Sequence, residues 1–334
     1  MNTVLRLGSR ASKLALIQAQ QVCAALASVN AGLELQIVPL TTTGDKLLDT
    51  PLAKIGDKGL FVKELETALL DGRVDVAVHS AKDLPTEVPE ELAILAFTER
   101  ADVHDVFVAG PGVAVAGLAD LSPAAQVASS SLRRRSQLLA GRPDLQVVDI
   151  RGNVETRLRK LAERHLAGTV LAAAGLGRLG LQGLASFRFS LDEMLPAVGQ
   201  GALALEGRAD DARVRELVGA LDHRATALAV RAERALMQAL QGGCQVPIGA
   251  LGELDRDGAQ RGACEADRAC AVEAAGERDA LRLRAFVGSL DGRDTVVDEL
   301  AGPASEPEAL GCALAGRLLA AGGERILARV RDGG

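Results

Sequence analysis

The stretch Phe61-Val-Lys-Glu-Leu-Glu-Thr-Ala-Leu-Leu-Asp-Gly-Arg-Val-Asp-Val-Ala-Val78 decides the fold class. Its first part predicts a helix over 61–70 that Asp71-Gly72 ends, and its second part predicts a continuous buried strand over 74–78. Strands and helices also alternate before this stretch, because strands are expected over 4–7 and 33–40 with a helix over 12–29 between them. Such alternation predicts an α/β domain with a largely parallel sheet.

The remaining sequence predicts a second α/β block and then a different pattern. Strands are expected near 127 and over 147–150, 170–174 and 203–205. From about residue 225 a helix leads into strands over 248–254 and 281–287 and a helix over 306–320. This change predicts a smaller α+β domain at the C-terminus. With 334 residues, the chain exceeds one ordinary core, and two or three domains are expected.

Composition and charge exclude several classes of protein. The net charge is −6 and aromatic residues make up 2% without any Trp or Tyr, which argues against a nucleic-acid binder. No apolar run is long enough to cross a membrane, and the first residues lack the apolar region of a signal peptide. The five Cys are odd in number and widely spaced, so they do not predict a disulfide framework. We expect a cytoplasmic protein.

Cys244 is predicted to lie on a sharp loop, Gln241-Gly-Gly-Cys-Gln-Val-Pro-Ile-Gly249. The residues over 225–240 favour a helix, Gly242-Gly243 is expected to end it, and Pro247 prevents it from resuming. A thiol on such a loop is often inert, because reactivity needs a suitable environment. Cys264 and Cys270 lie in the charged segment 255–279, which is expected to be a mobile loop without a function, and no Cys/His spacing resembles a zinc site.

Basic residues gather where predicted strands run into helices. One group is Ser129-Ser-Ser-Leu-Arg-Arg-Arg135, a second is Arg151-Gly-Asn-Val-Glu-Thr-Arg157, and a third position is Arg178. Hydroxyl groups and free N–H groups at a helix start bind anions, and Arg adds bidentate recognition of carboxylate or phosphate. Each group alone is also compatible with a solvated helix face. Together they favour one anion-binding cleft.

A further polar group, His79-Ser-Ala-Lys-Asp-Leu-Pro85, follows the buried strand. Ser80, Lys82 and Asp83 are expected at the carboxyl end of that strand, where open α/β sheets bind ligands. An Asp beside a Lys stays ionised, which suits it to stabilise developing positive charge. A simple turn before Pro85 is the alternative interpretation.

Two other segments have a competing interpretation. The segment Gly175-Leu-Gly-Arg-Leu-Gly180 matches the glycine spacing of a dinucleotide site, but no second parallel strand follows at the right distance, so that function is rejected. The segment over 50–61, with Lys54, Lys58 and Phe61, has the glycine and lysine content of a lid, or of a plain surface loop.

Taken together, these segments resemble the porphobilinogen deaminase (hydroxymethylbilane synthase) family over nearly the whole chain outside 255–279. The matching pieces are Asp49-Thr-Pro-Leu-Ala-Lys54, Lys58-Gly-Leu-Phe-Val-Lys-Glu64, Val78-His-Ser-Ala-Lys-Asp83, Ser130-Ser-Leu-Arg-Arg134, Arg151-Gly-Asn153, Leu195-Pro-Ala-Val-Gly-Gln-Gly201 and Gly242-Gly-Cys-Gln-Val-Pro-Ile248. Ala128 and Ser129 depart from the family, which usually has Gly and Thr there.

The resemblance implies a transferase of haem and tetrapyrrole biosynthesis that deaminates four porphobilinogen molecules and joins them head to tail into hydroxymethylbilane, releasing ammonia. It implies a dipyrromethane cofactor bound through a thioether to Cys244, with Asp83 as the catalytic residue that stabilises the azafulvenium cation. The resemblance further implies that the cofactor contacts Lys82, Asp83, Ser129, Ser131, Arg133, Arg134 and Arg157. Substrate carboxylates are expected at Arg10, Ser12, Ser80, Arg151 and Arg178.

The resemblance also implies two lobes like those of periplasmic binding proteins around a cleft, plus the smaller α+β domain. We predict domain 1 over 1–98 and 200–219, domain 2 over 104–195 and domain 3 over 223–334. A monomer without metal, membrane or nucleic-acid partners is expected, and hand-over of the product to the next enzyme of the pathway stays open. The rival functions are a non-catalytic binding protein of the same fold and a Cys–His hydrolase using Cys244 with His223.

Overall fold

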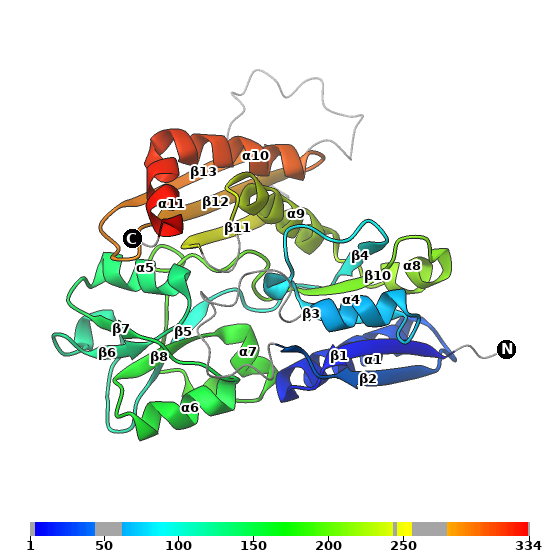
Figure 1. The fold of residues 1–334 in the computed structure, drawn as a ribbon, viewed down its shortest axis with the longest axis horizontal. Helices are drawn as coiled ribbons and strands as arrows, with labels where there is room; N and C mark the ends of the chain where they lie inside the picture. Colours follow the sequence, from blue (N-terminus) through cyan, green and yellow to red (C-terminus); the bar gives the residue numbers. More distant parts are fainter. Residues whose placement is uncertain (1–3, 44–61, 243–245, 256–278, 333–334) are drawn as a thin grey trace, which may run out of the picture.

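The computed structural model describes residues 4–43, 62–242, 246–255 and 279–332. These residues form two five-stranded sheets and one three-stranded sheet (Figure 1). The predicted fold class is confirmed, because the two larger sheets are mixed α/β layers and the C-terminal sheet is smaller and separate. Within the described part of the chain, no helix is both long and apolar enough to cross a membrane.

The first sheet has the strand order β2-β1-β3-β10-β4. Strand β1 (Leu5–Arg10) pairs in parallel with β2 (Leu35–Leu40) and β3 (Val76–Ser80). Strand β10 (Leu203–Arg208) is antiparallel to both β3 and β4 (Leu92–Phe97). Helices α1 (Lys13–Val29) and α8 (Ala212–Gly219) share one apolar core with the sheet, and α4 (Lys63–Leu70) packs in another core.

The second sheet repeats this topology with the order β7-β6-β8-β5-β9. Strand β6 (Gln126–Ala128) is parallel to β7 (Gln146–Val148) and β8 (Gly168–Ala172). Strand β5 (Asp105–Ala109) is antiparallel to β8 and β9 (Phe187–Arg188). The associated helices are α5 (Leu132–Gly141), α6 (Val154–Glu163) and α7 (Ala173–Arg178). The chain therefore builds two lobes of like topology and crosses between them after β4 and again before β10.

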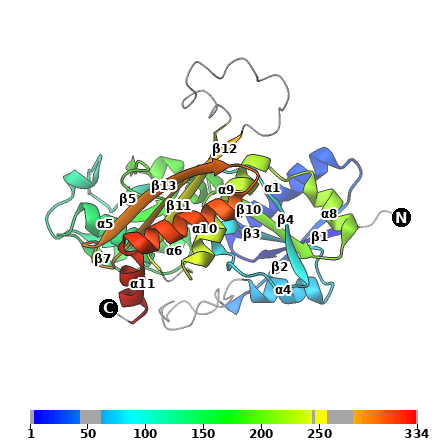
Figure 2. The same cartoon turned by 90° about the horizontal axis from the view of Figure 1, so that it is seen from above.

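The third sheet is an antiparallel meander of β11 (Ile248–Asp255), β12 (Ala280–Gly288) and β13 (Thr295–Pro303). Helices α9 (Arg224–Ala239) and α10 (Pro307–Leu318) share an apolar core with it, and α11 (Glu324–Arg331) closes that core. Figure 2 shows α10 running alongside β13, and Figure 1 shows this domain apart from the two larger sheets. Helix α9 also contacts β4, so the small domain rests on the first lobe.

Two features differ from the sequence expectations. The buried strand predicted over 74–78 runs over Val76–Ser80, so His79 lies inside β3 and its Nε2 meets Glu206 Oε2 at 3.0 Å. Strands β4, β5, β9 and β13 were not predicted. In β13 exposed and half-buried residues alternate, and the strand ends in Ala-Gly-Pro, so its apolar signal is weak. The strands of each sheet fall within one predicted domain, while the domain boundaries stay a prediction.

Candidate functional site

The site is organised around a single turn of 3₁₀ helix, η1 (Ala81–Asp83), at the carboxyl end of β3. The Ala81 N–H donates to the carbonyl of Ala202 at 3.0 Å, which ties the turn to the segment entering β10. Ala81 is buried, whereas Lys82 and Asp83 are half-buried. Because β3 is the central strand of its sheet, Asp83 is held by rigid backbone at the sheet edge where ligands bind.

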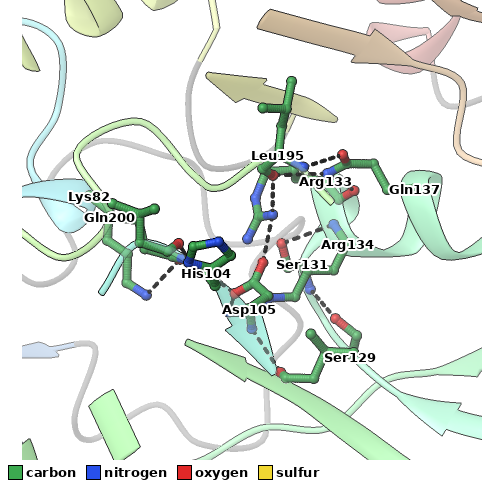
Figure 3. A network of polar contacts seen from close by, with 12 residues as sticks. Lys82, His104, Asp105, Ser129, Ser131, Arg133, Arg134, Gln137, Leu195 and Gln200 are labelled. Atoms are coloured by element: carbon green, nitrogen blue, oxygen red, sulfur yellow. Dashed lines mark hydrogen bonds and ion pairs between the residues drawn. The ribbon is translucent and has the colours of Figure 1, made fainter. Parts of the chain in front are cut away.

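Lys82 projects towards the second lobe. Its Nζ donates to Gln200 Oε1 at 3.4 Å (Figure 3). Burial, followed by the nearby Arg134, lowers the pKa of Lys82 to about 8, although Asp83 and Asp105 act in the opposite direction. Two carboxylates and two guanidinium groups, those of Arg133 and Arg134, therefore act on one amine at this position.

Arg133 and Arg134 lie in the first turn of α5 and both face the carboxylate of Asp105. Arg134 Nη2 lies 2.7 Å from Asp105 Oδ1, and Arg133 Nη1 lies 2.8 Å from Asp105 Oδ2. All three residues are buried. Arg133 Nη1 also donates to the carbonyl of Leu195 at 2.6 Å, and Arg134 Nη1 donates to that of Val170 at 2.9 Å. These contacts fix both guanidinium groups at the first residue of β5.

The serine hydroxyls predicted at this site shape the loop that leads into α5. Ser131 is the N-cap, and its Oγ accepts from the N–H of Arg134 at 3.4 Å. Ser129 Oγ accepts from the N–H of Ser131 at 3.3 Å. The departure at Ala128 is accommodated, because this residue is buried in β6 and its carbonyl accepts from Thr169 Oγ1 at 2.8 Å. In this structure the two serines therefore serve to hold the loop.

Arg151 and Arg157 come from the loop before α6 and from the helix itself. Asn153 caps α6, as predicted, by accepting from the N–H of Thr156 at 2.9 Å. Burial lowers the pKa of Arg157 to about 10, with further lowering by Arg134 and Arg151 and an opposing effect of Asp83. Arg157 Nε donates to the carbonyl of Gly152 at 2.9 Å. Arg151 Nη1 is buried without a hydrogen-bond partner within the described residues.

Two of the five predicted substrate residues line a small cavity between α1, β3 and α7. Ser80, Lys82 and Arg178 all line it. Ser80 Oγ accepts from Gln18 Nε2 at 2.9 Å, and Arg178 Nη2 donates to the carbonyl of Gly201 at 2.8 Å. Burial lowers the pKa of Arg178. The cavity therefore joins residues from both lobes.

Arg10 and Ser12 lie where β1 runs into α1. Arg10 is the last residue of β1, and Ser12 is the N-cap of α1, accepting from the N–H of Ala15 at 3.4 Å. An ion pair of 2.6 Å between Lys13 Nζ and Glu155 Oε1 joins the starts of α1 and α6. Arg10 and Ser12 are therefore placed on the side of the first lobe that meets the loop of Arg151 and Arg157.

A larger cavity of about 930 Å³ lies beside this region, between α1, α7, the first chain crossing and the link from α8 to α9. Arg178 lines both cavities, but Asp83 and the arginines of α5 do not line the larger one. Asp83 and the arginines of α5 do not line the smaller cavity either, whereas Ser80 and Lys82 line only the smaller one. Size alone does not identify the site.

The structure brings together most of the predicted site residues and adds two that were not predicted. Mutual electrostatic effects on pKa link Lys82 and Asp83 to Arg133, Arg134, Arg151 and Arg157. The additions are Asp105 and Gln200. Cys244, Lys54, Lys58 and Phe61, together with residues 256–278, lie outside the described residues. His223 caps the start of α9, which runs to Ala239, so it lies at the other end of this helix from the segment leading to Cys244.

The glycine-rich segment that matched a dinucleotide motif forms α7 and the turn that follows it. Gly175 and Gly177 lie inside this six-residue helix, and Gly180 follows with a φ of +70°. The helix follows β8, but the chain then passes through a short 3₁₀ turn over Gln182–Leu184 into β9, which pairs antiparallel with β5. A βαβ unit, which a dinucleotide site needs, is therefore not formed by these residues.

Comparison with known proteins gives consistent matches. A family model for the dipyrromethane cofactor binding domain of porphobilinogen deaminase matches residues 5–216, and one for the C-terminal domain of that protein matches residues 227–320. The porphobilinogen deaminase of Geobacter sulfurreducens is 48% identical over 326 residues, covering 98% of this chain and 94% of the relative. That of a Roseiflexus species is 48% identical over 328 residues, covering 98% and 100%.

Among solved structures, the likeness is much weaker. The periplasmic aliphatic sulphonate binding protein SsuA of Escherichia coli aligns with a TM-score of 0.39 and 14% identity, over 71% of this chain and 70% of that one. A likeness of this size carries no argument about function. The fold class rests instead on the strand orders of the three sheets.

Proposed function

Because the chain belongs to the porphobilinogen deaminase family, we propose how its own residues carry out the reaction of that family. Enzymes of this family belong to tetrapyrrole biosynthesis, deaminate porphobilinogen and carry a dipyrromethane cofactor. Four porphobilinogen molecules are joined into hydroxymethylbilane, and each step releases ammonia. The assignment of individual residues to these steps is the proposal.

The described residues fit a cofactor that bears several carboxylates. Arg134 Nε and Arg151 Nη1 are buried nitrogen donors without a hydrogen-bond partner within the described residues. Unsatisfied buried donors are costly, so such groups are expected to meet an acceptor. Each pyrrole of a dipyrromethane carries two carboxylates, which are acceptors for guanidinium groups. Lys82, Arg133, Arg134 and Arg157, with the hydroxyls of Ser129 and Ser131 at the loop, would hold them.

The charge of the site supports the same assignment. Lys82, Arg133, Arg134, Arg151, Arg157 and Arg178 provide cations, and Asp83 and Asp105 are the carboxylates among them. Burial lowers the pKa of Lys82 and of Arg157, and the neighbouring Arg134 lowers both further. Holding these cations together is therefore expected to cost free energy unless counter-ions are present. Carboxylates of cofactor and substrate supply those counter-ions, although the whole chain carries a net charge of −6.

Asp83 is proposed as the catalytic residue, and its place among these cations is the observation that carries the proposal. When bound, the dipyrromethane supplies the pyrrole carbon to which the first substrate is joined. Loss of ammonia from porphobilinogen breaks a C–N bond and leaves a positively charged azafulvenium. The Asp83 carboxylate, fixed on η1, stabilises this charge and accepts a hydrogen bond from the pyrrole N–H.

The substrate residues are proposed to bind the carboxylates of the incoming pyrrole. Ser80 and Arg178 line the cavity next to Lys82, and Arg151 offers its unpartnered buried nitrogen. Arg10 and Ser12 extend this surface at the start of α1. Bidentate guanidinium–carboxylate pairs orient the ring, so that the aminomethyl carbon of the substrate is presented beside Asp83.

Intact-protein mass spectrometry tests the covalent cofactor. Protein made in cells that produce porphobilinogen is expected to exceed the mass of the bare sequence by one dipyrromethane and to react with Ehrlich's reagent. Cys244→Ser is expected to remove both signals, while Cys312→Ser, on the exposed surface of α10, keeps them. Wild-type protein with the mass of the bare sequence would contradict the proposal, as would a Cys244→Ser variant that keeps the cofactor.

Together with the function, we propose that the protein is a cytoplasmic monomer that needs no metal. Colour with Ehrlich's reagent also separates this function from the two rivals. Neither a non-catalytic binding protein nor a Cys–His hydrolase carries a bound dipyrrole. Bilane formation from porphobilinogen by the purified protein decides between enzyme and binding protein.

A further inference from the structure

Gln200 occupies the second chain crossing, directly behind the catalytic turn. It is fully buried and lies between Gly199 and Gly201, whose φ angles are +70° and +91°. A Cβ atom on Gly199 would lie 3.0 Å from the Cβ of Ala81, and one on Gly201 would lie 2.5 Å from the carbonyl oxygen of Ala101. Glycine is therefore required on both sides, because the crossing is packed between η1 and the first crossing.

The side-chain amide of Gln200 contacts both lobes. On one side its Oε1 accepts from Lys82 Nζ at 3.4 Å. On the other its Nε2 donates to the carbonyl of Val103 at 2.7 Å and to Asp105 Oδ1 at 3.0 Å. Asp105 in turn holds Arg133 and Arg134. Figure 3 shows this row of contacts running from Lys82 across to α5.

An amide is the side chain that suits this position. It accepts a hydrogen bond from a cation and donates one to a carboxylate at the same time, without adding a charge. A carboxylate here would repel Asp105, and an apolar side chain would leave Lys82 and Asp105 without this partner. The carbonyl of Gln200 also accepts from Arg100 Nε at 2.8 Å, so the backbone of the residue is held as well.

We propose that Gln200 is a positioning residue that joins Lys82, beside Asp83, to the Asp105–Arg133–Arg134 cluster of the other lobe. This inference rests on the proposed function, since it assigns a role for that same site. Arg133 and Arg134 meet the cofactor from the second lobe, and Asp83 meets the reacting pyrrole from the first. Gln200 keeps the amine of Lys82 aligned with Asp83 and with the two arginines. The cofactor and the catalytic carboxylate therefore hold one relative position during the reaction.

The test compares Gln200→Leu and Gln200→Glu with wild-type holoenzyme. Gln137→Leu is the matched control, because Gln137 is also buried and, among the described residues, its amide bonds only to backbone groups of Arg133 and Leu195. The direct readout is the labelling rate of Lys82 by acetic anhydride near pH 8, mapped by peptide mass spectrometry. A role confined to stability would not change this rate, whereas a role in holding the amine would.

Gln200→Glu places a carboxylate beside Lys82, so its pKa rises and labelling is expected to fall at least about threefold. Gln200→Leu removes the acceptor, and labelling is expected to rise. In Gln200→Leu, kcat is expected to fall about tenfold or more with KM within about twofold, since a hydrogen bond to a charged group is lost while substrate contacts remain. Gln137→Leu keeps the labelling rate of wild type.

Unchanged labelling of Lys82 in both Gln200 variants would overturn the proposal. Failure of the proposed function has a different signature. In that case the wild-type protein itself carries no dipyrromethane and forms no bilane, whatever the labelling shows.

Discussion

Arg134 donates from Nη2 to Asp105 Oδ1 at 2.7 Å in a place where the carboxylate is fully shielded from solvent. The second oxygen of the same carboxylate lies 2.8 Å from Arg133 Nη1. One negative charge therefore holds two guanidinium groups that would otherwise repel each other. A net positive charge is left at the start of α5, directed at the cleft, and this arrangement suits the binding of a ligand carboxylate.

Replacing Asp105 by Asn is expected to lower the free energy of unfolding by about 3–5 kcal/mol at neutral pH, because it leaves two buried cations without their anion. Burial raises the pKa of Asp105, but Arg133 and Arg134 outweigh it and hold this pKa well below its usual range. The folded-state pKa is thus depressed, so its contribution is present above about pH 4 and is lost as the pH falls further. Chemical denaturation of both proteins at several pH values measures the difference.

That difference in unfolding free energy is expected to be constant above about pH 5 and to shrink below about pH 4. Asp120→Asn is the control, because Asp120 is exposed and its carboxylate accepts hydrogen bonds from the backbone N–H groups of Ala116 and Gly117. A difference for Asp105→Asn that does not depend on pH would show that the loss comes from packing and not from the charge.

Glu233 is expected to be the carboxylate on which the junction of the three sheets depends most. It is fully buried, and it pairs with Arg100 through both oxygens at 2.6 and 3.1 Å. It also accepts from the N–H groups of Gly199 and Gly252 at 2.6 and 2.8 Å. Glu233→Gln is expected to cost about 3–5 kcal/mol of unfolding free energy, because it leaves the largely buried guanidinium of Arg100 without its anion.

Glu308→Gln is the matched control, since Glu308 also pairs with an arginine through both oxygens, at 2.6 and 3.0 Å, but in an exposed position. Exposed pairs contribute about 0–1 kcal/mol. Urea unfolding of both variants gives the comparison. Equal losses would mean that burial of the Glu233 pair has no special effect.

Much of this arrangement was predictable from residue order. The helix and strand of the segment 61–78 were expected, and so were the caps at Asn153 and the ending of α9, because periodicity and capping are local properties. The family motifs placed Asp83, Lys82 and the arginines in one cleft. His79 was predicted to follow the buried strand but lies inside β3. The end of β3 is set by its pairing with β10 and not by its own residues.

Asp105 and Gln200 were not predictable in the same way. Asp105 begins a strand that was not predicted, and its role depends on partners that are 28 and 29 residues away in sequence. Gln200 belongs to a recognised motif, but the motif does not reveal that its amide reaches both lobes. Only the strand order, which places β10 beside β3, brings this crossing next to η1. Buried polar networks between distant segments leave no periodic signal.

Lys82→Met is expected to stabilise the protein when no cofactor is bound. The pKa of Lys82 is lowered to about 8 by burial and then by Arg134, against about 10.4 for an unfolded chain. Between these values the unfolded chain binds more protons, so stability rises with pH there, and below pH 8 the full cost of the buried charge remains. At pH 7 the variant is expected to gain about 1–2 kcal/mol, since part of the amine reaches solvent.

This gain should decrease as the pH rises towards 10. Thermal unfolding of protein made in cells that cannot form porphobilinogen measures it, with Lys63→Met on the exposed surface of α4 as the control. A variant that is less stable than wild type at pH 7 would show that the hydrogen bond to Gln200 outweighs the cost of burying the amine.

Asp83→Asn separates the catalytic role from the structural roles around it. Asn keeps the size of the side chain and one acceptor oxygen but removes the negative charge, so the azafulvenium loses its electrostatic partner. We expect kcat to fall by about 100-fold or more, the loss typical of removing one charge-stabilising group from an active site. The arginines and Lys82 stay in place, so KM for porphobilinogen should change much less.

Steady-state assays of bilane formation, on protein whose cofactor content is verified by mass, give both constants. Asp71→Asn, at the exposed end of α4, controls for loss of a surface carboxylate. A large rise in KM with an unchanged kcat would assign Asp83 to binding, because a group needed only for the ground state leaves the chemical step untouched.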